Sequence, residues 1–288
     1  MSIQETMVQE ALANEEIQAT ASKSGKYPIV ELFGPVIQGE GALIGTKTMF
    51  IRFGGCDYRC QKCDSLHAVM PRAVKANAQW MTSEEIFLRL LEARQTTGVN
   101  WVTYSGGNPC MHDVSELTKR LQDNDFAIAV ETQGTIIPKW LPYTNIVTVS
   151  PKSPGMGETF EEGKFSDFIR ATVASGVVCV LKVVVFSQQD IEFALEVGDI
   201  AMQAGLRPAM RFLSLGNPNP PILGQDMKLH DEQPGEFTAV PRDRDEHVKF
   251  LLNDYRSLCD DILSDSRVTD WKFLPQLHVL LYGNEASR

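Results

Sequence analysis

Short apolar segments rich in β-branched residues recur along the chain and are separated by segments with helical periodicity. Segments that are apolar almost throughout are typical of strands buried on both faces of a sheet. Six are predicted to be strands, at residues 48–53, 101–104, 126–131, 146–150, 177–186 and 210–213. Because alternating strands and helices form parallel sheets with right-handed crossovers, we predict an α/β fold, an incomplete (β/α)6-type partial TIM barrel. The active site of such a barrel lies at the C-terminal ends of its strands.

Helical segments lie between several of these strands. The residues from Thr82 to Glu85 have the spacing of a capping box, which marks the start of a helix. Apolar residues then recur at helical spacing, and the same spacing is found around Leu117 and Leu195. A last helix is expected at about residues 243–264, followed by a strand near residues 268–274 and an apolar tail.

The same pattern divides the chain into parts. Residues 1–26 are polar and are expected to be a flexible extension, frayed or helical, while residues 27–284 form one domain and residues 285–288 a tail. Residues 66–80 and the proline-rich residues 216–241 interrupt the alternation inside the domain. Long irregular loops are usually lids, binding loops or disordered insertions.

Charge and composition argue against several classes of function. The net charge is −10, and no run of Lys and Arg or basic helix with interleaved aromatic residues is present, so nucleic acid is not an expected partner. No apolar run reaches the roughly 18 residues of a membrane-spanning helix, and residues 1–26 lack the features of a signal peptide. Six cysteines, half of them in one loop, do not resemble a secreted disulfide framework. We therefore expect a cytoplasmic protein without a membrane partner.

The crowded cysteines are Cys56, Cys60 and Cys63. Iron–sulfur clusters are bound through thiolates, and a loop that offers three leaves one iron open to a substrate or cofactor. A zinc site is an alternative, but structural zinc almost always has four ligands, and no second pair of cysteines is present. Unrelated thiols are a third interpretation. The loop follows the first predicted strand, which places it at the expected active-site edge.

Polar residues follow the next three predicted strands and should share that edge. The second strand ends in Ser105-Gly-Gly-Asn-Pro109, where paired glycines allow close approach of the backbone to a ligand. The third and fourth end in Glu131-Thr-Gln-Gly134 and Ser150-Pro-Lys152. A carboxylate, an amide and an ammonium over one rim predict a pocket.

These motifs resemble those of the radical S-adenosylmethionine enzymes, in which a three-cysteine loop follows the first strand and a Gly-Gly turn the second. Over residues 27–284 the chain resembles the 7-carboxy-7-deazaguanine synthase family, through Ile37-Gln-Gly-Glu-Gly41, Phe50-Ile-Arg52, Gly55-Cys56, Cys63-Asp-Ser65 and Pro275-Gln-Leu-His278 together with the three strand-end motifs. The resemblance implies a [4Fe-4S] cluster whose open iron binds S-adenosyl-L-methionine. It also implies conversion of 6-carboxy-5,6,7,8-tetrahydropterin to 7-carboxy-7-deazaguanine and ammonia, in queuosine-type 7-deazapurine biosynthesis.

The resemblance assigns roles to single residues. Those expected to contact the substrate are Ile37, Gln38, Gly39, Glu40, Arg52, Ser105, Glu131, Gln133 and His278. Those expected to contact the sulfonium cofactor are Lys62, Cys63, Asp64, Gly107, Asn108, Ser150, Pro151, Lys152, Ser214 and Asn217. No side chain is assigned as catalytic, because the cofactor carries the radical. Arg52 and His278 each have a plainer alternative, as a strand-end surface charge and as a hydrogen-bonded core residue.

Two positions depart from the family pattern. The family binds Mg2+ through the residue two after the last cluster cysteine, which is Ser65 here instead of the common threonine. One hydroxyl is adequate because magnesium takes few protein ligands. Asn108 stands where the superfamily usually has glutamate; its amide oxygen still accepts hydrogen bonds, but the charge is lost.

The resemblance further implies a flavodoxin or ferredoxin as electron donor, and a homodimer. Two rival functions would account for some of the same motifs. One is another radical enzyme, such as a glycyl-radical activase, and the other is a noncatalytic metal-binding paralogue.

Overall fold

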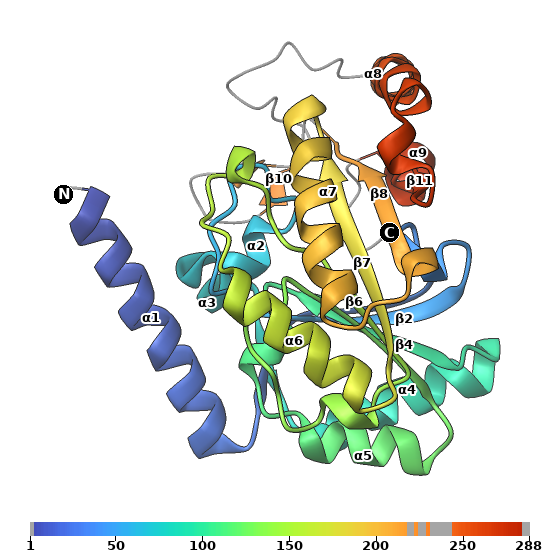
Figure 1. Ribbon diagram of the computed structural model, residues 1–288. Helices are drawn as coiled ribbons and strands as arrows, with labels where there is room; N and C mark the ends of the chain where they lie inside the picture. The colour runs from blue at the N-terminus through green and yellow to red at the C-terminus, as the bar shows by residue number, and fades with distance from the viewer. Residues whose placement is uncertain (1–2, 218–221, 224–228, 231–243, 284–288) are drawn as a thin grey trace.

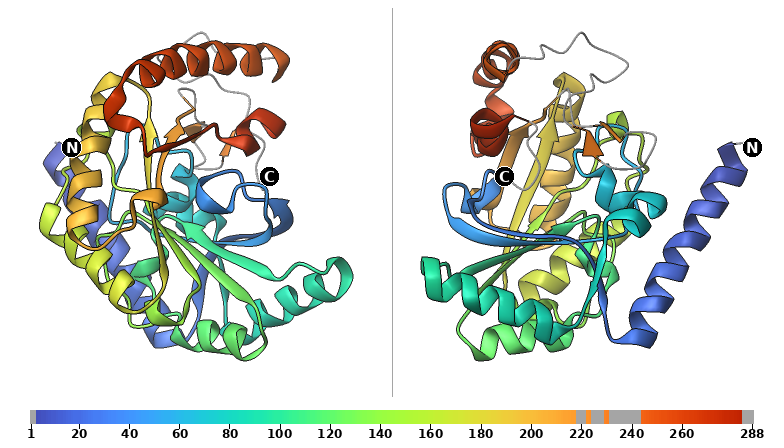
Figure 2. Two further views of the ribbon diagram at one scale, coloured as in Figure 1. Left: turned by 45° about the vertical axis from the view of Figure 1, so that its right-hand side comes forward. Right: turned by 180° about the vertical axis from the view of Figure 1, so that it is seen from behind.

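The computed structural model describes residues 3–217, 222–223, 229–230 and 244–283 (Figure 1). In this part of the chain the main sheet has nine strands, in the order β11-β8-β7-β6-β5-β4-β2-β1-β3. The sheet curves around its inner face without closing (Figure 2), and β11 and β3 are its edges. The predicted α/β partial barrel is confirmed.

All six predicted strands are present as one parallel series. They are β2 (Lys47–Phe53), β4 (Trp101–Gly106), β5 (Ala127–Thr132), β6 (Ile146–Val149), β7 (Val178–Val185) and β8 (Arg211–Leu215). Every residue of β8 is buried, and most residues of β7 are, which is why these strands appear as continuous apolar runs in the sequence. Since the strands are parallel, the segments that follow them meet at one edge of the sheet.

Two antiparallel strands at the other side of the sheet were not predicted. β1 (Tyr27–Ile37) pairs antiparallel with β2, and β3 (Gln79–Met81) pairs antiparallel with β1. The register of β1 against β2 is irregular at two points, and many of its positions are half-exposed or exposed. The strand therefore has no uninterrupted apolar run, which is why neither β1 nor its antiparallel pairing was predicted.

Helices cover the outer face of the sheet (Figures 1 and 2): α4 (Ser83–Thr97), α5 (Ser115–Asp123), α6 (Glu162–Ala174) and α7 (Gln188–Gln203). The predicted capping box opens α4, since the backbone N–H of Glu85 donates to the Thr82 hydroxyl at 3.2 Å and its carboxylate accepts from the Thr82 N–H at 2.7 Å. The core between sheet and helices contains fully buried Tyr104, Trp140 and Phe168. Short 3-10 helices occur at Gly41–Leu43, Pro109–Met111, Leu141–Tyr143, Pro154–Met156, Pro208–Met210 and Ser266–Val268.

The two segments expected to be irregular have different outcomes. Residues 66–80 are mostly ordered as α2 (Leu66–Val69), α3 (Pro71–Asn77) and the start of β3, and buried Ala68 accepts a hydrogen bond from the Gly55 N–H at 2.7 Å. This segment therefore supports the cysteine loop and is not a structureless lid. Residues 216–241 lie largely outside the described residues, apart from the paired strands β9 (Ile222–Leu223) and β10 (Leu229–His230).

Both ends of the described chain are helical. The N-terminal extension takes its helical alternative as α1 (Ile3–Ser24), on which Asn14 and Ile17 are buried. Toward the other end, α8 (Arg244–Ser264) is followed by β11 (Lys272–Leu274), which is shorter than predicted, and by α9 (Leu277–Tyr282). Among the described residues, no helix has the length and apolar character needed to cross a membrane.

Candidate active site

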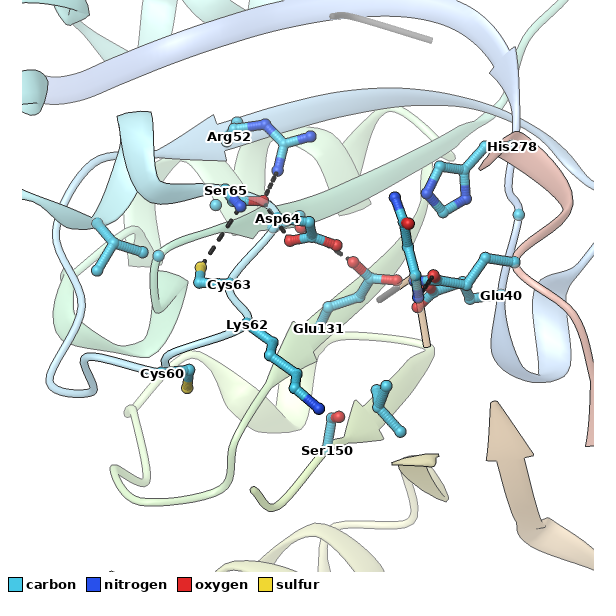
Figure 3. A pocket seen from close by; sticks show the side chains of 18 of the residues that line it. Glu40, Arg52, Cys60, Lys62, Cys63, Asp64, Ser65, Glu131, Ser150 and His278 are labelled. Carbon is cyan, nitrogen blue, oxygen red and sulfur yellow. Dashed lines mark hydrogen bonds between the residues drawn. The ribbon is translucent and has the colours of Figure 1, made fainter. Parts of the chain in front are cut away.

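A cavity of about 250 Å³ lies at the carboxyl ends of the parallel strands. Its walls come from the cysteine loop after β2, the turns after β4, β5 and β6, residues 37–40 at the end of β1, and residues 276–279. Figure 3 shows Cys60 and Cys63 on one side of the cavity, and Glu40 and His278 on the other. The parallel topology thus brings together segments that are far apart in the sequence.

Most residues predicted from the sequence line this cavity. They are Ile37, Gln38, Gly39, Glu40, Arg52, Cys56, Cys60, Lys62, Cys63, Asp64, Ser65, Ser105, Gly107, Glu131, Gln133, Ser150, Lys152, Asn217 and His278. Asn108, Pro151 and Ser214 are the predicted residues that do not line it.

Two of the loop thiols each accept a hydrogen bond from one backbone N–H group. Cys56 and Cys60 are buried and Cys63 is half-buried. The N–H of Tyr58 donates to Cys56 Sγ at 3.4 Å, and the N–H of Ser65 donates to Cys63 Sγ at 3.4 Å. Hydrogen bonds of this kind stabilise negative charge on sulfur. These two N–H groups would therefore favour the thiolate form once a metal displaces the protons.

The Gly-Gly turn after β4 packs directly on the cysteine loop. Gly106 has a φ of 126°, and a Cβ atom at Gly107 would lie 2.0 Å from the carbonyl oxygen of Gly55. The N–H of Gly107 donates to the Phe53 carbonyl at 3.0 Å. Glycine is required here because two backbone segments touch, in addition to any approach to a ligand.

The three thiols fit a cluster better than a single zinc ion. Among the described residues, no three His, Cys, Asp or Glu side chains form a group that could hold one metal ion. A cuboidal cluster binds each thiolate through a different iron, so its ligands need not converge on one point. Burial raises the pKa of Cys56 to about 12 and that of Cys60 to about 11, and it also raises the pKa of Cys63. Iron binding must therefore displace protons from these thiols.

Asn108 lies behind the cavity, which corrects the prediction that its amide oxygen contacts the cofactor. The side chain is fully buried. Its Oδ1 accepts from the Cys110 N–H at 3.1 Å and the Thr132 hydroxyl at 2.9 Å, while its Nδ2 donates to Asp57 at 2.8 Å. The oxygen is occupied by two donors, and a glutamate here would place a second carboxylate against Asp57.

Pro151 and Ser214 also lie beside the cavity. Pro151 stands between two residues that line it, and Lys152 Nζ donates to the Ser150 carbonyl at 2.8 Å and to its hydroxyl at 3.1 Å. Ser214 is fully buried in β8, and its hydroxyl has no hydrogen-bond partner in the described part of the chain. Of the two residues predicted in this part of the chain, Ser214 and Asn217, Asn217 is the one that lines the cavity.

Arg52 connects the cysteine loop to β1. Its Nε donates to Glu31, and its Nη1 donates to the Ser65 hydroxyl at 2.9 Å. That hydroxyl donates in turn to Asp64 at 2.8 Å, and His67 Nε2 lies 3.1 Å from the Glu31 carboxylate. Because the Arg52 side chain is only 17% exposed and lines the cavity, it is not a surface charge.

Glu131 is oriented through both of its carboxylate oxygens. Gln38 Nε2 donates to one oxygen at 3.0 Å, and the Ser105 hydroxyl donates to the other at 2.9 Å. The Gln38 side-chain oxygen accepts from the Glu40 N–H at 3.2 Å. A carboxylate fixed in this way presents its remaining lone pairs to the cavity in a defined direction.

Lys182 is a cavity residue that the sequence analysis missed. It pairs with Glu40, and the two side chains are 8% and 10% exposed. Burial alone would raise the pKa of Glu40, but the Lys182 ammonium, nearby His278 and a hydrogen bond from Gln276 lower it to about 2. Burial opposes the charge on Lys182, yet Glu40 and Glu131 raise its pKa. The sequence did contain a signal for this residue, a lysine inside an otherwise apolar strand, but hydrophobic periodicity alone does not identify it.

The segment that contains Gln276 and His278 closes the cavity opposite the cysteine loop. Gln276 Nε2 donates to Glu40, and the Leu277 N–H donates to the Gly39 carbonyl at 3.0 Å. A Cβ atom at Gly39 would lie 2.2 Å from His278 Nδ1. His278 therefore belongs to the cavity wall, as the site interpretation predicted, and not to the hydrophobic core.

The fold and the site together define the class of this protein, a partial (β/α) barrel enzyme with a three-cysteine loop at the carboxyl edge of its strands. No protein-family model matches it. It is 34% identical over 262 residues to the 7-carboxy-7-deazaguanine synthase of Bacillus subtilis (strain 168), covering 90% of this chain and 97% of that protein. The Bacillus cereus synthase is also 34% identical, over 261 residues and 98% of its length. The crystal structure of QueE from Escherichia coli shares the fold, with a TM-score of 0.57 and 23% identity over 92% of this chain and 98% of that one. The chain belongs to the 7-carboxy-7-deazaguanine synthase family.

Proposed function

We propose that the protein is a radical S-adenosylmethionine enzyme that converts 6-carboxy-5,6,7,8-tetrahydropterin to 7-carboxy-7-deazaguanine and ammonia. One observation carries the proposal: the thiols of the cysteine loop line the same cavity as the Gly-Gly turn and the fixed carboxylates of Glu40 and Glu131. Similarity to a synthase over nearly the whole of both chains supports the choice of substrate. The product would enter queuosine-type 7-deazapurine biosynthesis.

Cys56, Cys60 and Cys63 would hold the [4Fe-4S] cluster, and S-adenosyl-L-methionine would bind beside it. When bound and reduced, this pair supplies the radical that takes a hydrogen from the substrate. The loop itself also offers a charged group for the cofactor, the ammonium of Lys62. Lys62 Nζ lies 4.1 Å from the centre of the Phe186 ring, a cation–π distance that fixes its position at the cavity.

The carboxylates on the opposite wall suit the substrate. The aminopyrimidinone edge of a pterin carries N–H donors, and Glu40 and Glu131 offer charged acceptors, which make the stronger hydrogen bonds. With a pKa of about 2, Glu40 stays ionised near neutral pH. The forked guanidinium of Arg52, on the loop side of the cavity, suits the carboxylate of the substrate.

Several further roles rest on the family resemblance. Ser65 would bind Mg2+ through the lone pair that its hydroxyl keeps after accepting from Arg52 and donating to Asp64. A flavodoxin or ferredoxin would supply the electron, and the enzyme would act as a homodimer. A cytoplasmic location suits the free thiols of all six cysteines.

The reaction itself tests the proposal. Anaerobically purified and reduced protein is incubated with S-adenosyl-L-methionine, Mg2+ and the carboxytetrahydropterin, and 7-carboxy-7-deazaguanine is expected by mass spectrometry. Cofactor cleavage without this product would favour another radical enzyme, such as a glycyl-radical activase.

Iron content tests the ligands independently of the substrate. Replacing Cys56, Cys60 or Cys63 with alanine should abolish the bound iron and the brown colour. Cys179→Ala is the matched control, because this thiol is buried in the core within β7 and does not line the cavity. Colourless, zinc-loaded wild-type protein would overturn the cluster assignment.

A further inference from the structure

We infer that Gln133 is a positioning residue that donates a hydrogen bond to the Cys56 sulfur and raises the reduction potential of the cluster, with Asp57 fixing its orientation. The inference rests on the proposed function, because it requires the three loop cysteines to bind a cluster. It replaces the role suggested by the family resemblance, in which Gln133 contacts the substrate.

The geometry of Gln133 lets its amide nitrogen serve two acceptors. The residue follows β5, and only 6% of its surface is exposed. Its Nε2 lies 3.7 Å from Cys56 Sγ, within hydrogen-bond range for sulfur, and also donates to a carboxylate oxygen of Asp57. An amide nitrogen carries two hydrogens, so both bonds form at once.

Asp57 determines which end of the Gln133 amide faces the loop. Its carboxylate also accepts from Asn108 Nδ2 at 2.8 Å and from the Thr135 hydroxyl. A carboxylate accepts hydrogen bonds and repels an amide oxygen, so the nitrogen of Gln133 must point toward Asp57. The same orientation directs the second N–H of Gln133 to the neighbouring Cys56.

A donor at this position stabilises the reduced cluster more than the oxidised one, because reduction adds negative charge that spreads onto the thiolates. Hydrogen bonds to the sulfurs are among the features that set the potential of iron–sulfur clusters. Tyr58 and Ser65 contribute through backbone N–H groups, which side-chain substitution leaves in place. Gln133 donates from its side chain, so its contribution can be removed.

The test measures the midpoint potential of the cluster without S-adenosyl-L-methionine, by a redox titration followed by electron paramagnetic resonance. In Gln133→Leu the one-electron equilibrium constant for reduction should fall about tenfold, which is about 59 mV. Gln133→Met, which is unbranched, should show the same fall if the leucine variant folds poorly. Thr135→Val is the matched control, since it removes a donor to the same Asp57 carboxylate but none to Cys56, and it should shift the constant less than about twofold.

The possible outcomes distinguish failure of the proposed function from failure of the role inferred for Gln133. Wild-type protein without a cluster would overturn the proposed function. A full iron content and an unchanged potential in both Gln133 variants would overturn this inference and leave the proposed function standing. An equal shift in Thr135→Val would also overturn it, because the potential would then follow loosening of the loop and not the bond to Cys56.

Discussion

Replacing Lys182 with methionine should leave Glu40 charged and buried without its cation. Methionine keeps most of the length and apolar packing of the lysine side chain. Breaking a buried ion pair from one side costs about 3–5 kcal/mol, because the remaining charge stays desolvated. Burial would raise the pKa of Glu40, and Lys182 is the strongest of the influences that instead lower it to about 2, so the carboxylate depends on this cation. We therefore expect Lys182→Met to lose about 3 kcal/mol of unfolding free energy at pH 7.

Urea denaturation of the cluster-free protein, followed by circular dichroism, measures this loss. Combining Lys182→Met with Glu40→Gln should recover much of it, because no isolated charge remains. Lys164→Met is the control: Lys164 pairs with Glu161 on the surface, with side chains 55% and 47% exposed, so its loss should stay below about 1 kcal/mol. Equal destabilisation by Lys182→Met and Lys164→Met would refute the reasoning.

Acid should remove the same stabilisation. The folded pKa of Glu40, about 2, is below its ordinary value of 4.5, so its contribution is complete above 4.5 and is lost as the pH falls toward 2. The stability advantage of the wild type over the variant carrying both Lys182→Met and Glu40→Gln should therefore shrink across this window. An advantage that is the same at both ends of the window would contradict the assigned ion pair.

Three further substitutions test the support of the cysteine loop. Asn108→Asp places a carboxylate against Asp57, whose oxygen lies 2.8 Å from the present amide nitrogen, so iron per chain should fall severalfold. The double variant that carries Asp57→Asn and Asn108→Asp should restore the iron content. If it does not, the pairing of these two residues is refuted. Gly107→Ala puts a methyl group 2.0 Å from a backbone carbonyl and should abolish S-adenosyl-L-methionine binding by calorimetry, while Gly163→Ala, where no atom lies within 4 Å, should not. Asn14→Ala removes a 2.9 Å bond from α1 to the backbone carbonyl of Cys56, and absorbance should show severalfold faster loss of the cluster in air; an unchanged rate would mean that α1 does not protect it.

The parallel strands and the carboxyl-edge site could be predicted because each depends on local information. A buried parallel strand is apolar along its whole length, and the residue that follows it is then placed by topology. β1 could not be recognised in this way, since its bulges and exposed positions interrupt both the apolar run and the alternation. Its antiparallel pairing with β2 is a tertiary contact that no local pattern encodes.

The site residues that were misassigned or missed depend on partners distant in sequence. Asn108 was compared with the glutamate of other radical enzymes, but its role is set by Asp57 on another loop. The role of Lys182 follows from its ion pair with Glu40, which is 142 residues away in the sequence. Neither partner can be identified from one sequence, because pairing across the fold leaves no periodic signal.

The hydrogen bond between Gln276 and Glu40 spans 236 residues of sequence. Contacts between residues so far apart in the sequence form late and slowly, because closing a long loop costs conformational entropy. A nascent chain can therefore build the early strands and the cysteine loop long before residues 276–279, which complete the opposite wall, exist. During synthesis, a cluster loaded onto that loop would face open solvent until the segment around His278 docks, so the order of metal loading and chain completion decides how much oxygen the cluster meets.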